Sequence, residues 1–184
     1  KGIAKKDTSS VGIPCIRYAE IYTYYDYVIN DFKSFISSET AEKSKMLKKN
    51  DIIFVGSGET VEDIGKSVAF VSECEAYVGG DAIVFSPSDT INSVFFSYQL
   101  NDDIRRIQLR KLGQGSSVIH VYSSGLEGLL VCIPTLNEQN KIASTITSIL
   151  SKIEERNKNI NCFKLLKKAL MQDLLTGKVR VKTD

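Results

Sequence analysis

Residues 56–67, Gly-Ser-Gly-Glu-Thr-Val-Glu-Asp-Ile-Gly-Lys-Ser, have the composition of a phosphate-binding loop. The stretch follows the apolar run from Asp51 to Val55 and ends in Gly65-Lys66-Ser67, as a P-loop does. The spacing does not fit, because the first glycine of G-x-x-x-x-G-K-[ST] would fall on Thr60. Residues 67–71 are rich in β-branched and aromatic side chains and predict a strand, so no helix N-terminus would face a phosphate. We therefore interpret residues 56–67 as a polar surface loop between two strands.

Few other residues have the types and spacing that catalysis or metal binding requires. The one histidine, His120, alternates with Ile119 and Val121, and no serine, cysteine or aspartate is arranged around it at a recognisable catalytic spacing. The four cysteines are scattered singly, without a C-x-x-C pair, so no zinc site is predicted. We expect no metal, no cofactor and no catalytic residue in this chain.

The cysteines and the charges bear on location and partners. Cys15 and Cys132 lie in apolar runs, as buried free thiols do, which fits a reducing, cytoplasmic compartment. No apolar run approaches the roughly 18 residues of a membrane span, and no signal peptide is evident. The net charge is only +2, but residues 105–111 hold four basic groups and no acid. Such a run suits a polyanionic partner, and a solvated surface is the alternative.

Up to about residue 134 the pattern predicts a domain of short strands and loops with brief helices, of the α+β class. Asn101 is expected to cap a helix that continues to Leu112, and Glu39 to Lys49 is a second helical candidate. The predicted strands are short apolar or β-branched runs bounded by Gly, Ser, Asp or Pro. They comprise residues 13–18, 52–55, 68–71, 82–85, 118–122 and 129–133.

From residue 135 to 177 the pattern changes to one long helix, followed by a tail over residues 178–184. Thr135 and Glu138 form a capping box at its start, and Gly177 follows its expected end. A helix from Asn137 to Leu175 would be about 58 Å long. Its apolar residues recur at alternating steps of four and three, which marks a coiled-coil seam. The predicted dimerisation residues are Ile142, Ile146, Ile149, Ile153, Ile160, Phe163, Leu170 and Leu174.

One helix of this length cannot bury an apolar stripe by itself. We favour pairing with another helix, from a second copy or from a further part of a longer chain, over a helix folded back on its own domain. Arg156 and Lys167 occupy seam positions and would weaken the packing while helping to fix its register.

Two stretches near the end of the sequence carry a resemblance to a known family. They are "IPTLNEQNKIASTITSIL" from residue 133 and "LKKALMQDLLTGKVRV" from residue 166, and they resemble the C-terminal helix region of the specificity subunits of type I restriction–modification systems. "GIPCIRYAEIY", "DIIFVGSGETVEDIGK", "GGDAIVF" and "LGQGSSVIHVYSSGLEGLLVCIP" resemble one of its target-recognition domains in order. The family's usual subunit has two such domains and two long helices packed antiparallel, whereas this sequence has one of each.

The resemblance implies a small mixed-sheet recognition domain followed by a long coiled-coil helix. It implies a non-catalytic subunit that reads double-stranded DNA and docks the modification subunit, the methyltransferase that holds S-adenosylmethionine. The restriction subunit would join through the same complex, and the chain would pair as a homodimer. A coiled-coil scaffold protein with an incidental basic surface is the alternative.

Under this interpretation, the DNA-binding residues are polar or basic side chains of loops and strand ends. Lysines suit phosphates, Arg17 suits guanine, and Gln114 suits adenine through its amide. A plain glycine turn is the alternative for the loop that holds Gln114. The tyrosines of residues 22–27 are expected in the core more often than as base-stacking groups. The candidates are Lys5, Lys6, Arg17, Tyr18, Ser57, Glu59, Thr60, Lys66, Gln114, Ser116, Ser117 and His120.

Overall fold

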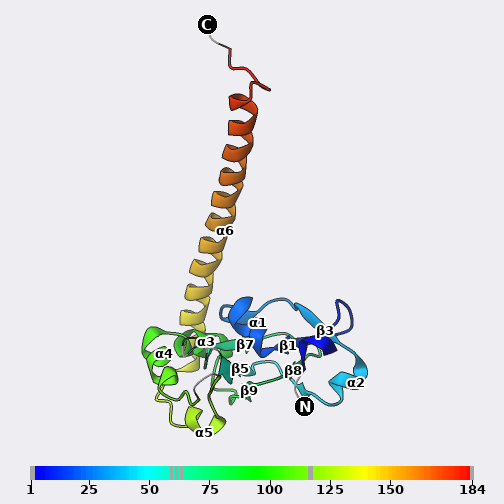
Figure 1. Ribbon diagram of the computed structural model, residues 1–184. Coiled ribbons are helices and arrows are strands. Elements are labelled where there is room, and N and C mark those ends of the chain that lie inside the picture. Colours follow the sequence, from blue (N-terminus) through cyan, green and yellow to red (C-terminus); the bar gives the residue numbers. More distant parts are fainter. Residues whose placement is uncertain (1–2, 59, 61, 63, 116–117, 183–184) are drawn as a thin grey trace. The chain divides into compact units, whose positions relative to one another are not determined.

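The computed structural model describes residues 3–58, 60, 62, 64–115 and 118–182. The chain divides into two compact units, with the boundary between Ala143 and Ser144. The elements are labelled in Figure 1. In chain order they are η1 (Lys5–Asp7), β1 (Ile13–Arg17), α1 (Tyr18–Thr23), β2 (Val28–Ile29), β3 (Ser34–Ile36), α2 (Ser38–Ala41), β4 (Lys45–Met46), β5 (Ile52–Val55), β6 (Ser57–Gly58), β7 (Ser67–Phe70), β8 (Tyr77–Gly79), β9 (Ala82–Phe85), α3 (Ser93–Leu100), α4 (Asp103–Arg110), β10 (Ile119–His120), α5 (Ser123–Leu126) and α6 (Leu136–Leu175).

A mixed sheet in the order β2-β7-β5-β9 forms the centre of the first unit. Strand β5 pairs antiparallel with both neighbours, and β2 runs parallel to β7. All four residues of β5 are buried, and successive side chains enter different clusters. Ile53 and Val55 pack with Ile21 of α1, whereas Ile52 and Phe54 pack in a second cluster. The period-two alternation of the strand therefore gives the sheet a core on each face.

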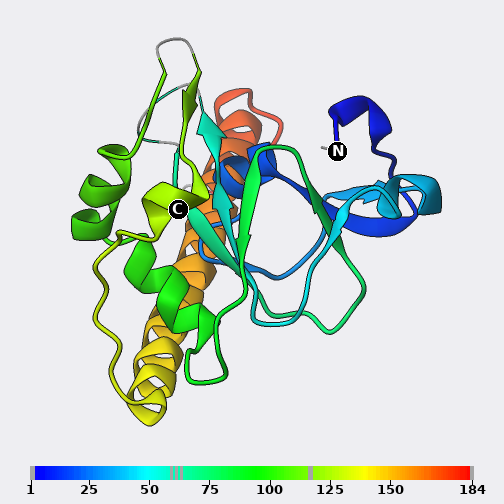
Figure 2. The same cartoon turned by 90° about the horizontal axis from the view of Figure 1, so that it is seen from below.

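Two smaller β structures complete the first unit. A second mixed sheet has the order β3-β1-β8-β4, and Cys15, Ile36 and Ala41 lie in its small core. Strands β6 and β10 pair antiparallel as a separate two-stranded ribbon. Figures 1 and 2 both show β3 and α2 at the opposite end of this unit from α3 and α4. The α+β class and the mixed sheets expected from the sequence are confirmed.

The predicted start of the helix from Asn101 to Leu112 is wrong, because α4 begins at Asp103. Asn101 ends α3, and its amide donates to the carbonyl of Ser67 at 2.7 Å and accepts from the Ser67 N–H at 3.2 Å. Asp102 caps α4 instead, because its carboxylate accepts from the Arg105 N–H at 2.9 Å. The Asn101 side chain, which the local pattern predicts as a helix cap, thus bonds to the backbone of β7 instead.

Three other segments differ from their predicted conformation. Residues 39–49 form only the one-turn helix α2 and the short strand β4, because β4 pairs with β8. Residues 118–122 yield only the two-residue strand β10. Residues 129–133 form no strand, and the apolar side chains of Leu129 and Val131 instead pack beside the second core cluster. Burial against a neighbouring element satisfies these apolar side chains without a sheet partner.

The first two turns of α6, to Ala143, belong to the first unit. As predicted, Thr135 caps the helix, with its hydroxyl accepting from the Glu138 N–H at 3.4 Å. The fully buried Gln139 accepts from the Asn92 N–H at 2.8 Å and donates to the carbonyls of Thr90 and Pro134 at 3.1 and 2.9 Å. Its amide therefore satisfies three backbone groups, which fixes the start of the helix to the loop before α3.

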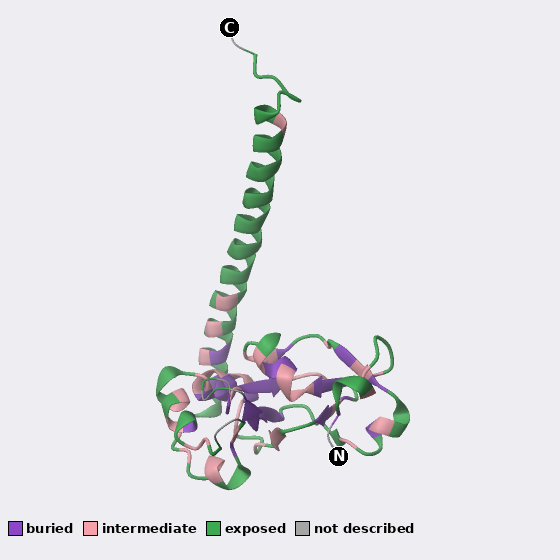
Figure 3. Ribbon diagram, viewed as in Figure 1, coloured by how far each residue is buried: buried purple, intermediate pink, exposed green. Residues whose placement is uncertain are grey.

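The second unit holds the rest of α6, which continues without interruption to Leu175. The stop at Gly177 is confirmed, because its φ is +72° and its N–H donates to the Leu174 carbonyl at 3.2 Å. Figure 3 shows α6 exposed along nearly all of its length beyond Ala143. Within the described residues, no helix combines the length and apolarity that crossing a membrane would require.

We predict that Gln139→Ala destabilises the first unit by about 2–4 kcal/mol, because three backbone groups lose their partner in a buried site and a cavity remains. Chemical denaturation measures this change. Asn137→Ala, an exposed change two residues away in the same helix, should stay within about 0.5 kcal/mol of the parent chain. Equal midpoints for the two variants would show that the buried amide has no such role.

We further predict that one thiol of the four is protected. Cys15 is buried and the other three cysteines are exposed. Burial, reinforced by the nearby Glu20 carboxylate, raises the pKa of the Cys15 thiol from 9.0 to about 12. At pH 8 a disulfide reagent should modify three thiols promptly and the fourth only after unfolding.

The same shift makes stability depend on pH in the alkaline range. The pKa of the Cys15 thiol is 9.0 in the unfolded chain and about 12 in the folded one. The contribution of the protonated thiol to the free energy of unfolding is therefore complete below pH 9 and is lost as the pH rises toward 12. Prompt reaction of all four thiols at pH 8 would contradict the assignment of Cys15 to the core.

Candidate nucleic-acid interface

The glycine-rich loop over residues 56–67 joins the antiparallel strands β5 and β7. The strand predicted behind the loop is confirmed as β7, so no helix begins there as a P-loop requires. Two backbone bonds close the base of the loop, from the Val55 N–H to the Lys66 carbonyl and from the Gly65 N–H to the Val55 carbonyl, both at 2.8 Å. The loop is thus an extension of a hairpin in the central sheet.

The β6–β10 ribbon brings three of the predicted DNA-binding residues together. His120 pairs in register with Ser57 across the ribbon. On its other side, His120 exchanges two backbone hydrogen bonds with Gln114, at 2.8 and 2.9 Å. Gln114 is exposed, and His120 is partly buried. Two backbone hydrogen bonds therefore anchor Gln114 to the ribbon while its side chain stays exposed.

A shallow groove of about 380 Å³ brings together three more predicted residues, Lys5, Arg17 and Tyr18, with Gly80 and Asp81. Gly80 has φ +80°, and a Cβ on it would lie 2.9 Å from the Tyr18 ring, so the tyrosine packs directly on the glycine backbone. Lys5 is exposed, whereas Arg17 and Tyr18 are partly buried. The groove thus has a cation at its rim and an arginine and an aromatic ring in its wall.

Asp81 connects the groove with the ribbon. The buried Ser57 hydroxyl donates to Oδ2 of Asp81 at 2.8 Å, and the Gly56 N–H donates to the Asp81 carbonyl at 2.6 Å. A Cβ on Gly56 would lie 2.5 Å from that carbonyl oxygen, so only glycine permits this approach. Ser57 therefore orients the exposed carboxylate of Asp81 instead of reaching outward itself.

Arg17 is held by a buried carboxylate. Its Nε and Nη2 both donate to Oε1 of Glu20, at 3.0 and 2.8 Å, and Glu20 is 1% exposed. The Ser34 hydroxyl donates to the same oxygen. Glu20 accepts hydrogen bonds from the Nε and Nη2 side of the guanidinium. The N–H groups of Nη1 point in another direction and can donate to a different acceptor. An arginine held in this way is pre-organised to donate to an acceptor pair such as that of guanine.

Two other predicted residues, Lys6 and Thr60, are exposed. Lys66 is partly buried, and its Nζ donates to the Tyr25 carbonyl at 2.5 Å. Three predicted residues, Glu59, Ser116 and Ser117, lie outside the described residues.

Sequence reasoning missed Asp81 and Tyr122. The Tyr122 side chain is 55% exposed, and its ring lies beside that of His120, with centroids 6.3 Å apart and planes inclined at 24°. The signal for Tyr122 was present, because residues i and i+2 of an extended segment face the same side. Nothing in the sequence marked Asp81, since its role depends on Ser57, 24 residues earlier. Of the tyrosines of residues 22–27, Tyr25 is in the core and Tyr24 is exposed.

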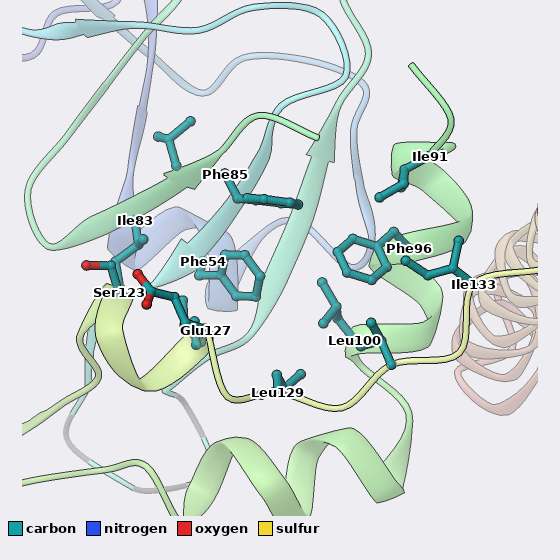
Figure 4. A pocket seen from close by; sticks show the side chains of 13 residues that line it. Phe54, Ile83, Phe85, Ile91, Phe96, Leu100, Ser123, Glu127, Leu129 and Ile133 are labelled. Atoms are coloured by element: carbon teal, nitrogen blue, oxygen red, sulfur yellow. The ribbon is translucent and has the colours of Figure 1, made fainter. Parts of the chain in front are cut away.

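An apolar pocket of about 470 Å³ opens elsewhere in the first unit. Figure 4 shows the rings of Phe54, Phe85 and Phe96 along it, with Ser123 and Glu127 close together at one end. Among the described residues, no group of histidine, cysteine and acidic side chains is arranged to hold a metal ion. The pocket offers apolar contact area, and its polar groups do not form a nucleophile and base pair.

In the second unit, the seam residues are exposed. Ile149, Ile153, Ile160, Phe163, Leu170 and Leu174 are between 41% and 68% exposed. Ile146 is partly exposed, and Ile142, in the first unit, packs beside the second core cluster of that unit. An apolar stripe of this length on a single helix is typical of an unpaired coiled-coil partner.

Comparison with known proteins identifies the family. Residues 3–161 match the model of the type I restriction modification DNA specificity domain. The chain is 33% identical over 104 residues to the putative type I restriction enzyme MjaX specificity subunit of Methanocaldococcus jannaschii, covering 56% of this chain and 24% of that protein. It is 22% identical over 148 residues to the EcoKI specificity subunit of Escherichia coli, covering 80% and 32%. The chain thus spans a quarter to a third of the length of these curated relatives.

Solved structures show the same fold. The S subunit of a type I restriction–modification system from M. genitalium matches with a TM-score of 0.55 at 16% identity, over 94% of this chain and 41% of that one. A chain from a structure on complex assembly and conformational transition of the type I R-M system matches with a TM-score of 0.62 at 13% identity, with the same two coverages. Because the family model matches most of the chain and the fold agrees, this protein belongs to the family of type I restriction–modification specificity subunits.

Proposed function

We propose that this chain reads one half-site of a duplex DNA sequence for a type I restriction–modification complex. The observation that supports this function best is the gathering of predicted DNA-binding side chains around Asp81. Lys5, Arg17 and Tyr18 lie in the groove, and Gln114 and His120 lie on or beside the ribbon, whose buried Ser57 holds the Asp81 carboxylate. They come from segments far apart in the sequence, and they combine cations, amides and planar rings without a catalytic arrangement.

The contacts divide into two classes by their chemistry. Lys5 and Lys6 neutralise phosphates, which gives affinity without sequence information. Gln114 pairs with adenine through its amide, and the outer edge of the Arg17 guanidinium pairs with guanine. The neighbouring rings of His120 and Tyr122 offer planar faces for contact with a sugar or a base edge. Sequence is thus read by groups whose positions are fixed by backbone pairing or by a buried carboxylate.

Catalysis belongs to the partners in this proposal. The modification subunit supplies S-adenosylmethionine and the methyltransferase site, and the restriction subunit joins through the same complex in the cytoplasm. This chain holds no cofactor of its own. The modification subunit grips the outer face of α6 between Leu165 and Leu175. If charge-reversing substitutions on this face left co-purification with the modification subunit intact, that result would contradict the proposed contact.

The proposed partner for the seam of α6 is the same helix of a second copy. At roughly 25 cal/mol per Å² of apolar surface, covering seven half-exposed side chains on each helix provides the main driving force. A two-fold symmetric pair would carry two reading domains and would recognise a palindromic pair of half-sites. The helix of 40 residues, about 60 Å long, sets the separation of the half-sites.

Arg156 and Lys167 select one arrangement of that pair. In a parallel pair each cation would face the same residue of the other chain within the apolar seam, and the repulsion between these like charges would destabilise the pair. An antiparallel pair that sets Ile153 against Phe163 places both cations beside apolar residues. Sliding it by one heptad, so that Ile149 meets Leu174, would set Arg156 directly against Lys167. We infer that the antiparallel register with Ile153 against Phe163 is the one adopted.

We predict that selection from a randomised duplex pool enriches a bipartite site. The binding constant for that site should fall steeply with salt, because bound cations release counterions from the phosphates. Lys5→Ala should reduce the slope of log K against log salt by about one and leave the enriched sequence unchanged. Gln114→Ala should instead cost about 1–3 kcal/mol and relax one base position. An unenriched pool, with or without the modification subunit, would favour a scaffold protein.

We predict that a mixture of Ile153→Cys and Phe163→Cys chains forms mixed disulfides, in a background where Cys74, Cys132 and Cys162 are serine. Each variant alone should cross-link poorly, because the two cysteines of its dimer lie in different layers of the antiparallel seam. Gel mobility under non-reducing conditions separates the species. Efficient cross-linking of either variant alone would indicate a parallel pair, and monomers at every concentration in ultracentrifugation would exclude the pairing.

A further inference from the structure

The arm of the glycine-rich loop that returns to β7 is held by helix α4. Nη1 of Arg106 donates to the Ile64 carbonyl at 2.8 Å, and Nη2 donates to the Glu62 carbonyl. One planar guanidinium therefore bridges two carbonyls of the same arm. A lysine has a single donor centre and cannot hold both carbonyls in this fixed geometry.

A second contact from α4 lies one turn further along the helix. Leu109 is fully buried, and it packs against Gly65, where an added Cβ would meet its side chain at 3.0 Å. Gly65 has φ +68°, so the backbone here takes a conformation that glycine favours. Arg106 and Leu109 are spaced i, i+3 and therefore share one face of α4. That face provides both a polar and an apolar contact for the returning arm.

The outgoing arm of the loop is held separately. Gly58 of β6 pairs with Ile119 in the ribbon, and the Val121 N–H donates to the Gly56 carbonyl at 2.8 Å. The ribbon therefore fixes the start of the loop beside His120, and Arg106 fixes its end. Loss of either contact would free one arm while the sheet beneath stays intact.

Charge alone does not explain the position of Arg106. It belongs to the basic run of residues 105–111, which as a sequence suggested a phosphate-binding surface. Arg110, one turn further along α4, is exposed, whereas Arg106 is partly buried and turned toward the loop. The two arginines thus offer the same charge on the same helix with different roles, and each serves as a control for the other.

We propose that Arg106 is a positioning residue for sequence reading: its fork fixes the returning arm of the 56–67 loop, and selectivity among duplexes depends on that fixation more than affinity does. This inference rests on the proposed DNA-reading function. It assigns Arg106 to loop geometry, while Arg110 contributes only charge to binding.

The test compares Arg106→Met, Arg106→Lys and the matched control Arg110→Met in the full chain. Affinities are measured for the duplex that the parent chain enriches and for a scrambled duplex of equal length, and melting temperature is recorded for each variant. We expect Arg106→Met to lower the ratio of the two affinities about tenfold, the order of one well-placed base contact. Arg106→Lys should fall between it and the parent. Arg110→Met should lower both affinities by the same factor and leave the ratio unchanged.

Hydrogen exchange gives a readout that does not depend on DNA. Peptides over residues 55–67 should exchange faster in Arg106→Met than in Arg110→Met, whereas β5 and β7 stay protected in both. If Arg106→Met does not fold, Arg106→Lys, which keeps the charge and most of the side chain, carries the comparison. An unchanged affinity ratio in a folded Arg106 variant would overturn this inference and leave the proposed function standing. A parent chain that enriches no duplex would remove the proposed function and this inference with it.

Discussion

The burial of β5 on both faces is the constraint on which the rest of the first unit depends. Its side chains enter two cores in alternation, so the strand cannot slide by one residue without moving each set of side chains into the core that the other set fills. The register of β7 and β9 follows from that of β5. Strand β6 and the glycine-rich loop follow β5 along the chain, and Asp81 directly precedes β9. Positions at the polar edge are therefore set by an apolar strand beneath it.

Arginine and lysine have two different uses in this domain. Arg17, Lys66 and Arg106 each donate to a carboxylate or carbonyl of the protein itself, whereas Lys5, Lys6 and Arg110 are exposed. Exposed cations raise affinity for any duplex, because phosphates are present at every position. Held cations instead order the backbone and side chains that they bond to, and under the proposed function these lie beside the groups that would touch bases. A net charge of only +2 is consistent with a surface in which placement of the cations matters more than their number.

The long helix poses a different physical problem from the domain. Its first turns are fixed by Gln139 and Ala143, whose burial makes them part of the first unit. Beyond Ala143, apolar side chains repeat along the helix without cover on their own unit. Pairing with an equivalent helix would remove that surface from water, and the two cations in the seam would limit the registers available to the pair. In the proposed assembly, the same element thus serves as spacer and as dimerisation surface.

The sequence alone determined the elements whose signals are local. The capping box at Thr135, the stop at Gly177 and the 3.5-residue repeat depend on neighbours along the chain, and the helix followed as expected. Strands β1, β5, β7 and β9 were also foreseen, because apolar runs bounded by turn residues are a local pattern. The family, too, could be identified from motif residues and their spacing.

Only the tertiary structure decided which polar groups work together. Asn101 bonds to Ser67 across the fold, and Ser57 orients Asp81 over a separation of 24 residues. By sequence, Arg106 belongs to a basic run that predicts a charged surface, whereas in the fold its guanidinium donates to the loop carbonyls. Local pattern gives the type of a side chain and the periodicity around it. Hydrogen-bond partners far apart in sequence are chosen by the packing of the sheets, and that choice leaves no periodic signal along the chain.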